Sequence, residues 1–71
     1  MLSFEQFIDL VDKNYNDRPF ELRYGQTVMN VLQSVWNEKY KELSGGYNDC
    51  FYDDGIVRFT LDRLQMDWPR E

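Results

Sequence analysis

The spacing of apolar residues along the chain predicts three helices separated by two breaks. The first helix begins after Ser3, because Ser3 and Gln6 fit a capping box in which each side chain satisfies a backbone N–H of the other residue. Its apolar face has the i, i+3, i+4, i+7 spacing of a helix and consists of Phe4, Phe7, Ile8 and Val11. The run NYND (14–17) and Pro19 are expected to end this helix.

The second predicted helix is the longest and covers residues 22–43. One apolar stripe follows it throughout and contains Met29, Leu32, Trp36, Tyr40 and Leu43. The charged residues between them are expected on the solvent side: Glu38, Lys39, Lys41 and Glu42. The run SGG (44–46) stops the helix, since glycine readily adopts the left-handed conformation found at helix C-termini.

The third helix is expected over residues 54–68, with Pro69 after it. Its predicted buried face is Ile56, Val57, Phe59, Thr60, Leu61, Leu64 and Trp68. The sequence therefore predicts an all-α fold, a small three-helix domain with a long central helix, and one domain over residues 1–71.

The composition leaves packing or association as the means of stabilising such a small domain. A chain of 71 residues buries only about 60% of its unfolded surface. The single cysteine, Cys50, excludes an internal disulfide, and a chain without histidine offers few zinc ligands. The aromatic content of 17% suits either a tight core or an interface.

The charge balance and the N-terminal segment limit the expected ligands and the expected location of the protein. With 8 basic and 13 acidic residues the net charge is −5, which argues against direct binding of nucleic acid. The N-terminal segment carries acids within its apolar region and has no basic start, so neither a signal peptide nor a membrane span is expected. A lone thiol without an export signal indicates a cytoplasmic location.

The segment NDCFYDDG (48–55) is the strongest candidate for chemistry, because three carboxylates, a thiol and two aromatics lie close together. The spacing of a calcium loop fails, since it would place Cys50, Tyr52 and Leu61 at ligand positions. We therefore expect no metal and no cofactor; the alternative is a weak divalent-cation site at Asp49, Asp53 and Asp54.

A folding role is the favoured interpretation of the same segment. Asp53 or Asp54 would cap the third helix, Phe51 and Tyr52 would cover the core, and Cys50 would be buried as a small apolar residue. Catalysis is not expected. The chain has no histidine to activate the thiol, and a domain of this size can hardly enclose a cleft.

Polar residues also line the start of the second helix. Arg23, Gln26 and Asn30 follow the i, i+3, i+7 spacing of one helical face. Gly25 within the helix costs about 1 kcal/mol relative to alanine, which a close approach of the FYDD loop would explain. The strip either bonds to the loop, with Arg23 paired to Asp49 or Asp53, or is exposed for recognition.

Three segments together resemble a family of small tailed-phage proteins: RYGQTVMNVL (23–32), NDCFYDD (48–54), and Phe59, Leu64 and Trp68. The family pattern is an Arg-x-Gly-Gln helix start with an Asn four residues on, a Gly-rich turn, an Asp-x-Phe-Tyr-x-Asp segment and a short aromatic-ended helix. The corresponding positions here are Arg23, Gly25, Gln26, Asn30, Asp49, Phe51, Tyr52, Asp53 and Trp68.

The likeness covers residues 23–68, about two-thirds of the chain, and departs from the family at Cys50, where a proline is expected, and in an added N-terminal helix. The family has no established activity. The resemblance implies a phage origin, hence the host cytoplasm, and a helical fold.

These observations predict a non-enzymatic protein that acts by protein–protein contact on a host or phage protein. The expected binding residues are Arg23, Gln26, Asn30, Asp49, Phe51, Tyr52 and Asp53. The alternative is an inhibitor that mimics nucleic acid and occupies a DNA- or RNA-binding protein, although Arg58 and Arg63 dilute its acidic charge. A structural subunit of a larger particle is a third class.

The first helix either closes the domain's own core or forms a homodimer with the uncovered part of the second helix. A protein binder should expose an apolar aromatic patch, whereas a mimic should show an unbroken acidic face.

Overall fold

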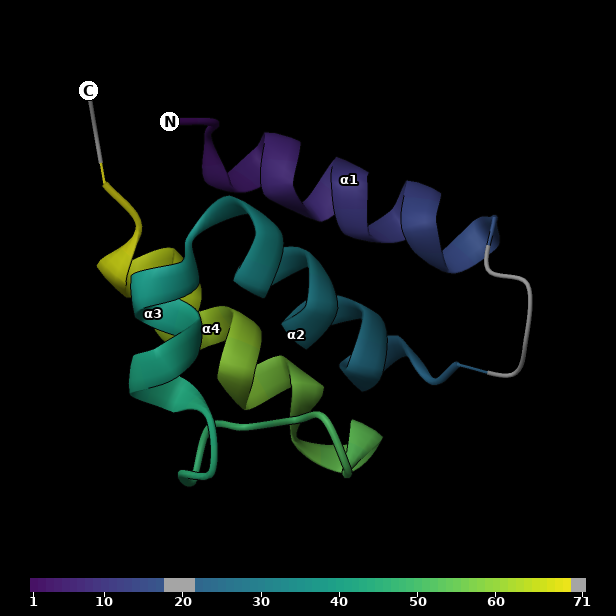
Figure 1. Ribbon diagram of the computed structural model, residues 1–71, viewed down its shortest axis with the longest axis vertical. Helices are drawn as coiled ribbons and strands as arrows, with labels where there is room; N and C mark the ends of the chain where they lie inside the picture. Colours follow the sequence, from purple (N-terminus) through teal and green to yellow (C-terminus); the bar gives the residue numbers. More distant parts are fainter. Residues whose placement is uncertain (18–21, 70–71) are drawn as a thin grey trace.

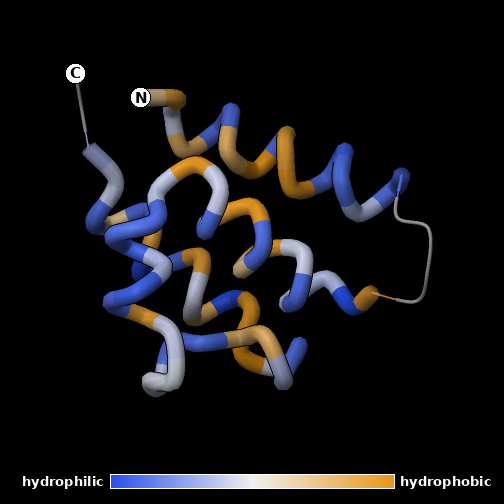
Figure 2. The backbone as a smooth tube through the Cα atoms, in the orientation of Figure 1, coloured by the Kyte–Doolittle hydropathy of each residue, from blue (hydrophilic) through white to orange (hydrophobic). Residues whose placement is uncertain are grey.

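Four α-helices and one short 3-10 turn make up the computed structural model, which describes residues 1–17 and 22–69 (Figure 1). In chain order they are α1 (Phe4–Asn16), α2 (Tyr24–Val35), α3 (Asn37–Leu43), η1 (Asp54–Ile56) and α4 (Val57–Asp67). The fold is a small all-α domain, as the apolar spacing predicts. Hydrophobic and hydrophilic residues alternate along the helices, as expected where each helix has one buried side (Figure 2).

Helix α1 begins with the predicted capping box. The Ser3 hydroxyl accepts the Gln6 N–H at 3.1 Å, and the Gln6 side-chain oxygen accepts the Ser3 N–H at 2.8 Å. The helix ends at Asn16, with Asp17 as its C-cap. Pro19, which we expected to end it, lies outside the described residues.

The predicted central helix over residues 22–43 is wrong in its length, because α2 begins at Tyr24 and the chain leaves the helical conformation at Trp36. The Trp36 backbone has φ −150° and ψ 70°, and α3 starts in a new direction at Asn37. The indole of Trp36 packs edge-on against Trp68 at the end of α4, with ring centroids 5.1 Å apart. The break allows α3 to turn back against α4 (Figure 1).

The third predicted helix is present, although its first three residues, Asp54–Ile56, form the 3-10 turn η1. Thr60 and Leu64 of α4 are fully buried. Phe59, which we expected on the buried face, is 62% exposed, so that expectation is wrong. Successive helical residues are turned by about 100°, so a helix that buries Thr60 and Leu64 turns Phe59 outward.

The core is formed by side chains from every α-helix and from the loop before η1. Its buried apolar residues are Phe7, Val11, Val28, Met29, Val31, Leu32, Leu43, Cys50, Leu64 and Trp68. Phe7 and Val11 of α1 are fully buried within this single chain, so α1 closes the domain's own core. The alternative, a homodimer through α1, would therefore have to form without these two side chains.

An aromatic cluster joins the two ends of the chain. Trp68 packs against Phe4 and Phe7, with ring centroids 5.7 and 4.9 Å away, and against Trp36. Its indole N–H donates to the Leu2 carbonyl at 2.8 Å. The cluster ties α1 to the end of α4 without a disulfide, and aromatic pairs of this kind add about 0.5–1.5 kcal/mol each beyond their buried area.

Among the described residues, no helix has both the length and the apolar content needed to cross a lipid bilayer.

Candidate interaction surface

The loop before η1 lies directly on the start of α2. A Cβ atom added to Gly25 would lie 2.1 Å from the Cys50 carbonyl oxygen, a separation that real Cβ atoms essentially never show. The Gly25 N–H donates to the Asp54 carboxylate at 2.9 Å, and the Cys50 thiol lies 3.5 Å from the Gly25 carbonyl oxygen. The predicted close approach of the FYDD loop to Gly25 is confirmed.

The three loop aspartates bind different backbone groups. Asp49 accepts the N–H groups of Gly45 and Phe51 at 2.8 and 2.9 Å, and Asp53 accepts the Gly55 N–H at 2.8 Å. Asp53 thereby caps η1, as predicted, while Asp54 is bound to α2. In the described part of the chain, no three acidic or cysteine side chains are grouped closely enough to hold a metal ion.

Arg23 contacts the loop, but through other partners than those predicted. Its guanidinium donates to the Phe51 carbonyl at 3.0 Å and lies 3.9 Å from the Asp54 carboxylate. The expected pairing with Asp49 or Asp53 is wrong, because both of those carboxylates are turned toward N–H groups of the loop itself. Both side chains of the Arg23–Asp54 pair are nearly half exposed, so the pair is weak.

The other two members of the polar strip do not reach the loop through any described hydrogen bond. Gln26 accepts the Arg23 N–H at 3.0 Å and so serves the start of its own helix. Asn30 is exposed and lines an open hollow of about 450 Å³ between α1 and α2, together with Leu10 and Asn14. Of the three, only Arg23 therefore binds the loop, and the alternative of an exposed recognition strip stays a prediction.

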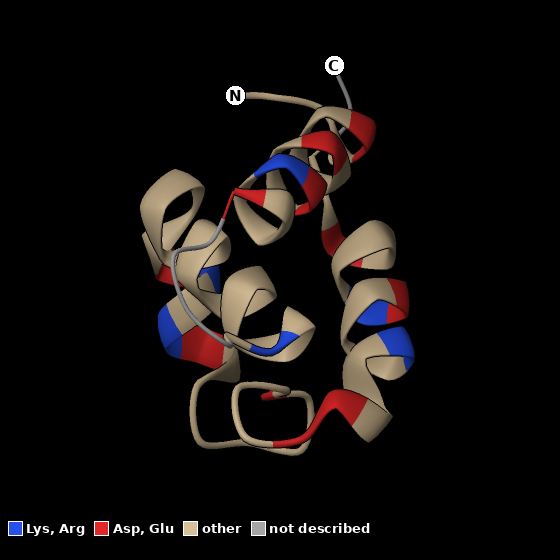
Figure 3. Ribbon diagram, turned by 90° about the vertical axis from the view of Figure 1, so that its right-hand side faces the viewer, with Lys and Arg blue, Asp and Glu red and all other residues tan. Residues whose placement is uncertain are grey.

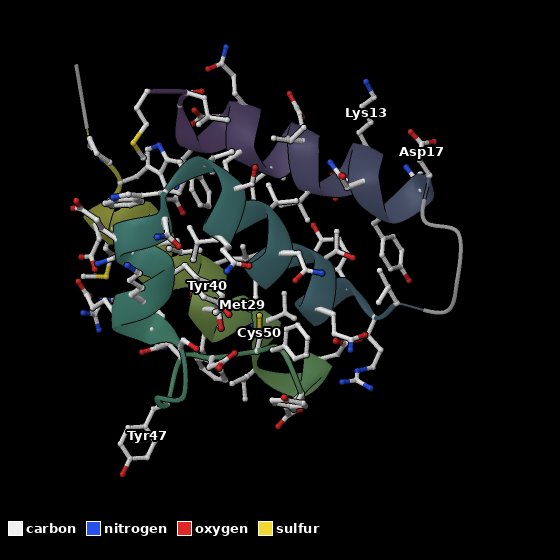
Figure 4. All side chains as sticks on the ribbon, in the orientation of Figure 1. Lys13, Asp17, Met29, Tyr40, Tyr47 and Cys50 are labelled. Carbon is white, nitrogen blue, oxygen red and sulfur yellow. The ribbon has the colours of Figure 1, made fainter. Side chains whose placement is uncertain are left out.

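Cys50 is fully buried beside Gly25, which agrees with the prediction that it packs as a small apolar residue. Burial raises the pKa of the Cys50 thiol, and the carboxylates of Asp49 and Asp54 add to this effect. The thiol therefore stays protonated at neutral pH and is a poor nucleophile. Cys50 belongs to the same buried core cluster as Met29, whereas Tyr47 projects from the loop into solvent (Figure 4).

Four large apolar or aromatic side chains are exposed on the loop and on α4, and we call them the exposed apolar surface. Their exposed fractions are 100% for Tyr47, 81% for Tyr52, 62% for Phe59 and 80% for Met66. The expectation that Tyr52 covers the core is wrong, since its ring rests edge-on against the half-buried Phe51 at 4.8 Å.

Helix geometry relates the two side chains of α4 to each other, and one hydrogen bond joins the loop to α4. Phe59 and Met66 are seven residues apart, so they lie on the same face of α4. The Thr60 hydroxyl donates to the Asn48 carbonyl at 2.7 Å, which fastens the loop next to Tyr47 to the first turns of α4. The sequence contained the signal for Phe59 and Met66: if Thr60, Leu64 and Trp68 face the core, these two must face away.

A closed ring of ion pairs joins α3 to α4. The Lys39 ammonium lies 2.6 Å from Asp67 and 2.8 Å from Glu42, and Arg63 lies 2.6 Å from Asp67 and 3.4 Å from Glu42. We expected Lys39 on the solvent side, but it is only 7% exposed, because it packs over the Trp36 ring at 5.5 Å. Its place three residues after Trp36 and four before Leu43 could have indicated this burial.

The ring shifts the pKa values of its members. Burial opposes the charged form of Lys39, but its hydrogen bonds to Asp67 and Glu42 outweigh that effect and raise the Lys39 pKa. Hydrogen bonds from Lys39 and Arg63 lower the pKa of Asp67. In the view of Figure 3, Lys and Arg lie among the acidic residues on the helices.

Comparison with protein-family models, curated proteins and solved structures gave no match for this chain. The resemblance to small phage proteins therefore stays a prediction.

Proposed function

We propose that this chain is a non-enzymatic domain that binds another protein through the exposed apolar surface. The observation that supports this proposal is the exposure of Tyr47, Tyr52, Phe59 and Met66, each by 62% or more, whereas the other aromatics of residues 1–17 and 22–69 are buried or partly buried. Exposed aromatic and Met side chains are typical of protein-binding sites, where these residue types are enriched.

The chemistry of the remaining groups favours binding over catalysis. Cys50 is buried with a raised pKa, and the loop carboxylates already accept hydrogen bonds from backbone N–H groups. Mimicry of nucleic acid is less favoured, because Asp54 is bound to Gly25 and because Arg58 and Arg63 interrupt the acids of α4. If the phage resemblance holds, the partner is a host or phage protein.

The test compares capture of proteins by the wild-type chain and by a double variant, Phe59→Ser with Met66→Ser. Both side chains are exposed, so circular dichroism should show an unchanged helix content. A matched control, Gln33→Ser with Lys41→Ser, alters two exposed helical residues that do not belong to the exposed apolar surface. We expect a protein from the producing cell, identified by mass spectrometry, to be retained by the wild type and the control and lost by the double variant. Equal retention by all three chains would contradict the proposal.

A further inference from the structure

Two opposite charges beside Phe59 have no ion-pair partner among the described residues. Arg58 and Asp62 are exposed on α4, whereas Arg63 on the same helix is engaged by Glu42 and Asp67. Arg58 precedes Asp62 by four residues, which is the less favourable order for an ion pair within a helix. Both side chains are therefore available to an outside partner.

The helix geometry places these charges on one side of Phe59. With about 100° and 1.5 Å per residue, Arg58 and Asp62 are separated by about 40° around α4 and by about 6 Å along it. Phe59 lies about 60° from Asp62 around the helix, in the other direction from Arg58. The exposed face of α4 thus has an aromatic ring on one side and a positive charge followed by a negative charge on the other.

A second copy of the same helix fits this pattern when it runs antiparallel. Such a dimer has a two-fold axis that lies in the interface and is perpendicular to α4. The axis reverses the direction of the helix in the second copy, but the charged side of one helix still lies next to the charged side of the other. When the axis crosses the exposed face of α4 midway between the heights of Arg58 and Asp62, Arg58 of each copy faces Asp62 of the other, and the two Phe59 rings meet beside these pairs. A parallel arrangement would not bring both pairs together.

From this self-complementarity we infer that α4 is a homodimer interface, with two Arg58–Asp62 ion pairs between copies and a Phe59–Phe59 contact. The inference rests on the proposal that the exposed apolar surface is a protein-binding site, and it names a second copy of this chain as the occupant. It also relocates the dimer from α1, whose Phe7 and Val11 are buried, to a helix with exposed apolar residues.

Charge reversal tests the inference, because the two residues should compensate each other. Sedimentation equilibrium is measured on the wild type, Arg58→Asp, Asp62→Arg and the variant carrying both substitutions. Each single reversal places like charges opposite each other twice in the dimer, and we expect a dissociation constant at least about tenfold weaker. The double reversal restores both pairs and should return the dissociation constant to within about threefold of the wild type.

Matched controls carry the same charge changes on α1, at exposed positions outside the interface: Lys13→Asp and Asp9→Arg. Neither should alter the dissociation constant by more than about twofold, apart from the general effect of net charge, which 0.3 M salt screens. A dimer that responds equally to the α1 and the α4 reversals, or one that the double reversal does not restore, overturns the inference.

A wild-type chain that remains monomeric up to about millimolar concentration, the limit of weak association, also overturns it. This outcome is distinct from failure of the proposed function. If the chain is monomeric but still captures a foreign protein through Phe59 and Met66, the proposed function is supported and the dimer is contradicted. A dimer that obeys the charge reversals without capturing any foreign protein supports the inference.

Discussion

Replacing Gly25 by alanine should destabilise the fold, although the same change inside an ordinary helix stabilises it. The added Cβ would lie 2.1 Å from the Cys50 carbonyl oxygen and 2.8 Å from the Asp54 carboxylate. A van der Waals contact needs a separation of at least 3.4 Å, so the loop would have to move by more than 1 Å. The nearest atom belongs to backbone, which a change of rotamer cannot relieve.

The expected magnitude follows from three effects. Overpacking costs about 1–3 kcal/mol. Displacement of the loop weakens the hydrogen bond from the Gly25 N–H to the Asp54 carboxylate. Because this carboxylate is partly exposed, we take the lower end of the range for hydrogen bonds to charged groups, about 1.5 kcal/mol. The higher helix propensity of alanine returns about 1 kcal/mol. The net loss is about 1.5–3.5 kcal/mol, a large part of the roughly 4–10 kcal/mol expected for a domain of this length.

Urea unfolding followed by circular dichroism measures this loss. With a denaturant slope of about 1 kcal/mol/M for a small domain, the midpoint should fall by about 1.5–3.5 M. Ser34→Ala, at an exposed position of the same helix, is the matched control and should raise stability by a few tenths of a kcal/mol. If Gly25→Ala behaves like this control, the close approach of the loop to α2 is refuted.

Three further predictions concern charge. Lys39 and Arg63 lower the pKa of Asp67, so the ionised Asp67 stabilises the fold above the unfolded aspartate pKa of about 3.9. This stabilisation is lost as the pH falls through the lower pKa of the folded state. Thermal unfolding between pH 5 and pH 2 should show the loss of stability, and the Asp67→Asn variant should lose less stability over the same pH range. A double-mutant cycle of Arg23→Ala with Asp54→Ala should give a coupling below about 1 kcal/mol, as for other exposed pairs, and a larger value would contradict the observed exposure. Calorimetric titration with calcium, magnesium, manganese and zinc should show no binding tighter than about 100 µM, weaker than sensor sites, and a micromolar site of defined stoichiometry would show that the loop aspartates serve a metal.

Part of the candidate site could be predicted from the sequence, because the signals were local or steric. Asp53 binds an N–H two residues away, and the need for glycine at position 25 revealed that another backbone lies close to it. The partner of Arg23 could not be predicted in the same way. Asp49, Asp53 and Asp54 are equivalent by composition and differ only in which backbone group each carboxylate reaches once the loop has folded onto α2.

The sequence by itself determined the all-α class, the capping box at Ser3, the burial of Cys50 and the presence of the last helix. Each of these depends on interactions within a few residues or on the apolar character of a side chain, which a linear pattern records. The same pattern predicted one helix through Trp36, because the apolar stripe continues across that residue without a glycine or proline.

Only the tertiary structure decided where that helix breaks, which way α4 faces and which charges are buried. Trp36 leaves the helix where it meets Trp68, 32 positions away in the sequence. Lys39 is buried over the Trp36 ring, where its ammonium lies 2.6 Å from Asp67 on another helix. Phe59 is exposed because Thr60 and Leu64 fill the space beneath α4. Such outcomes depend on contacts between distant segments, whose combined free energy outweighs local propensity and which no local pattern records.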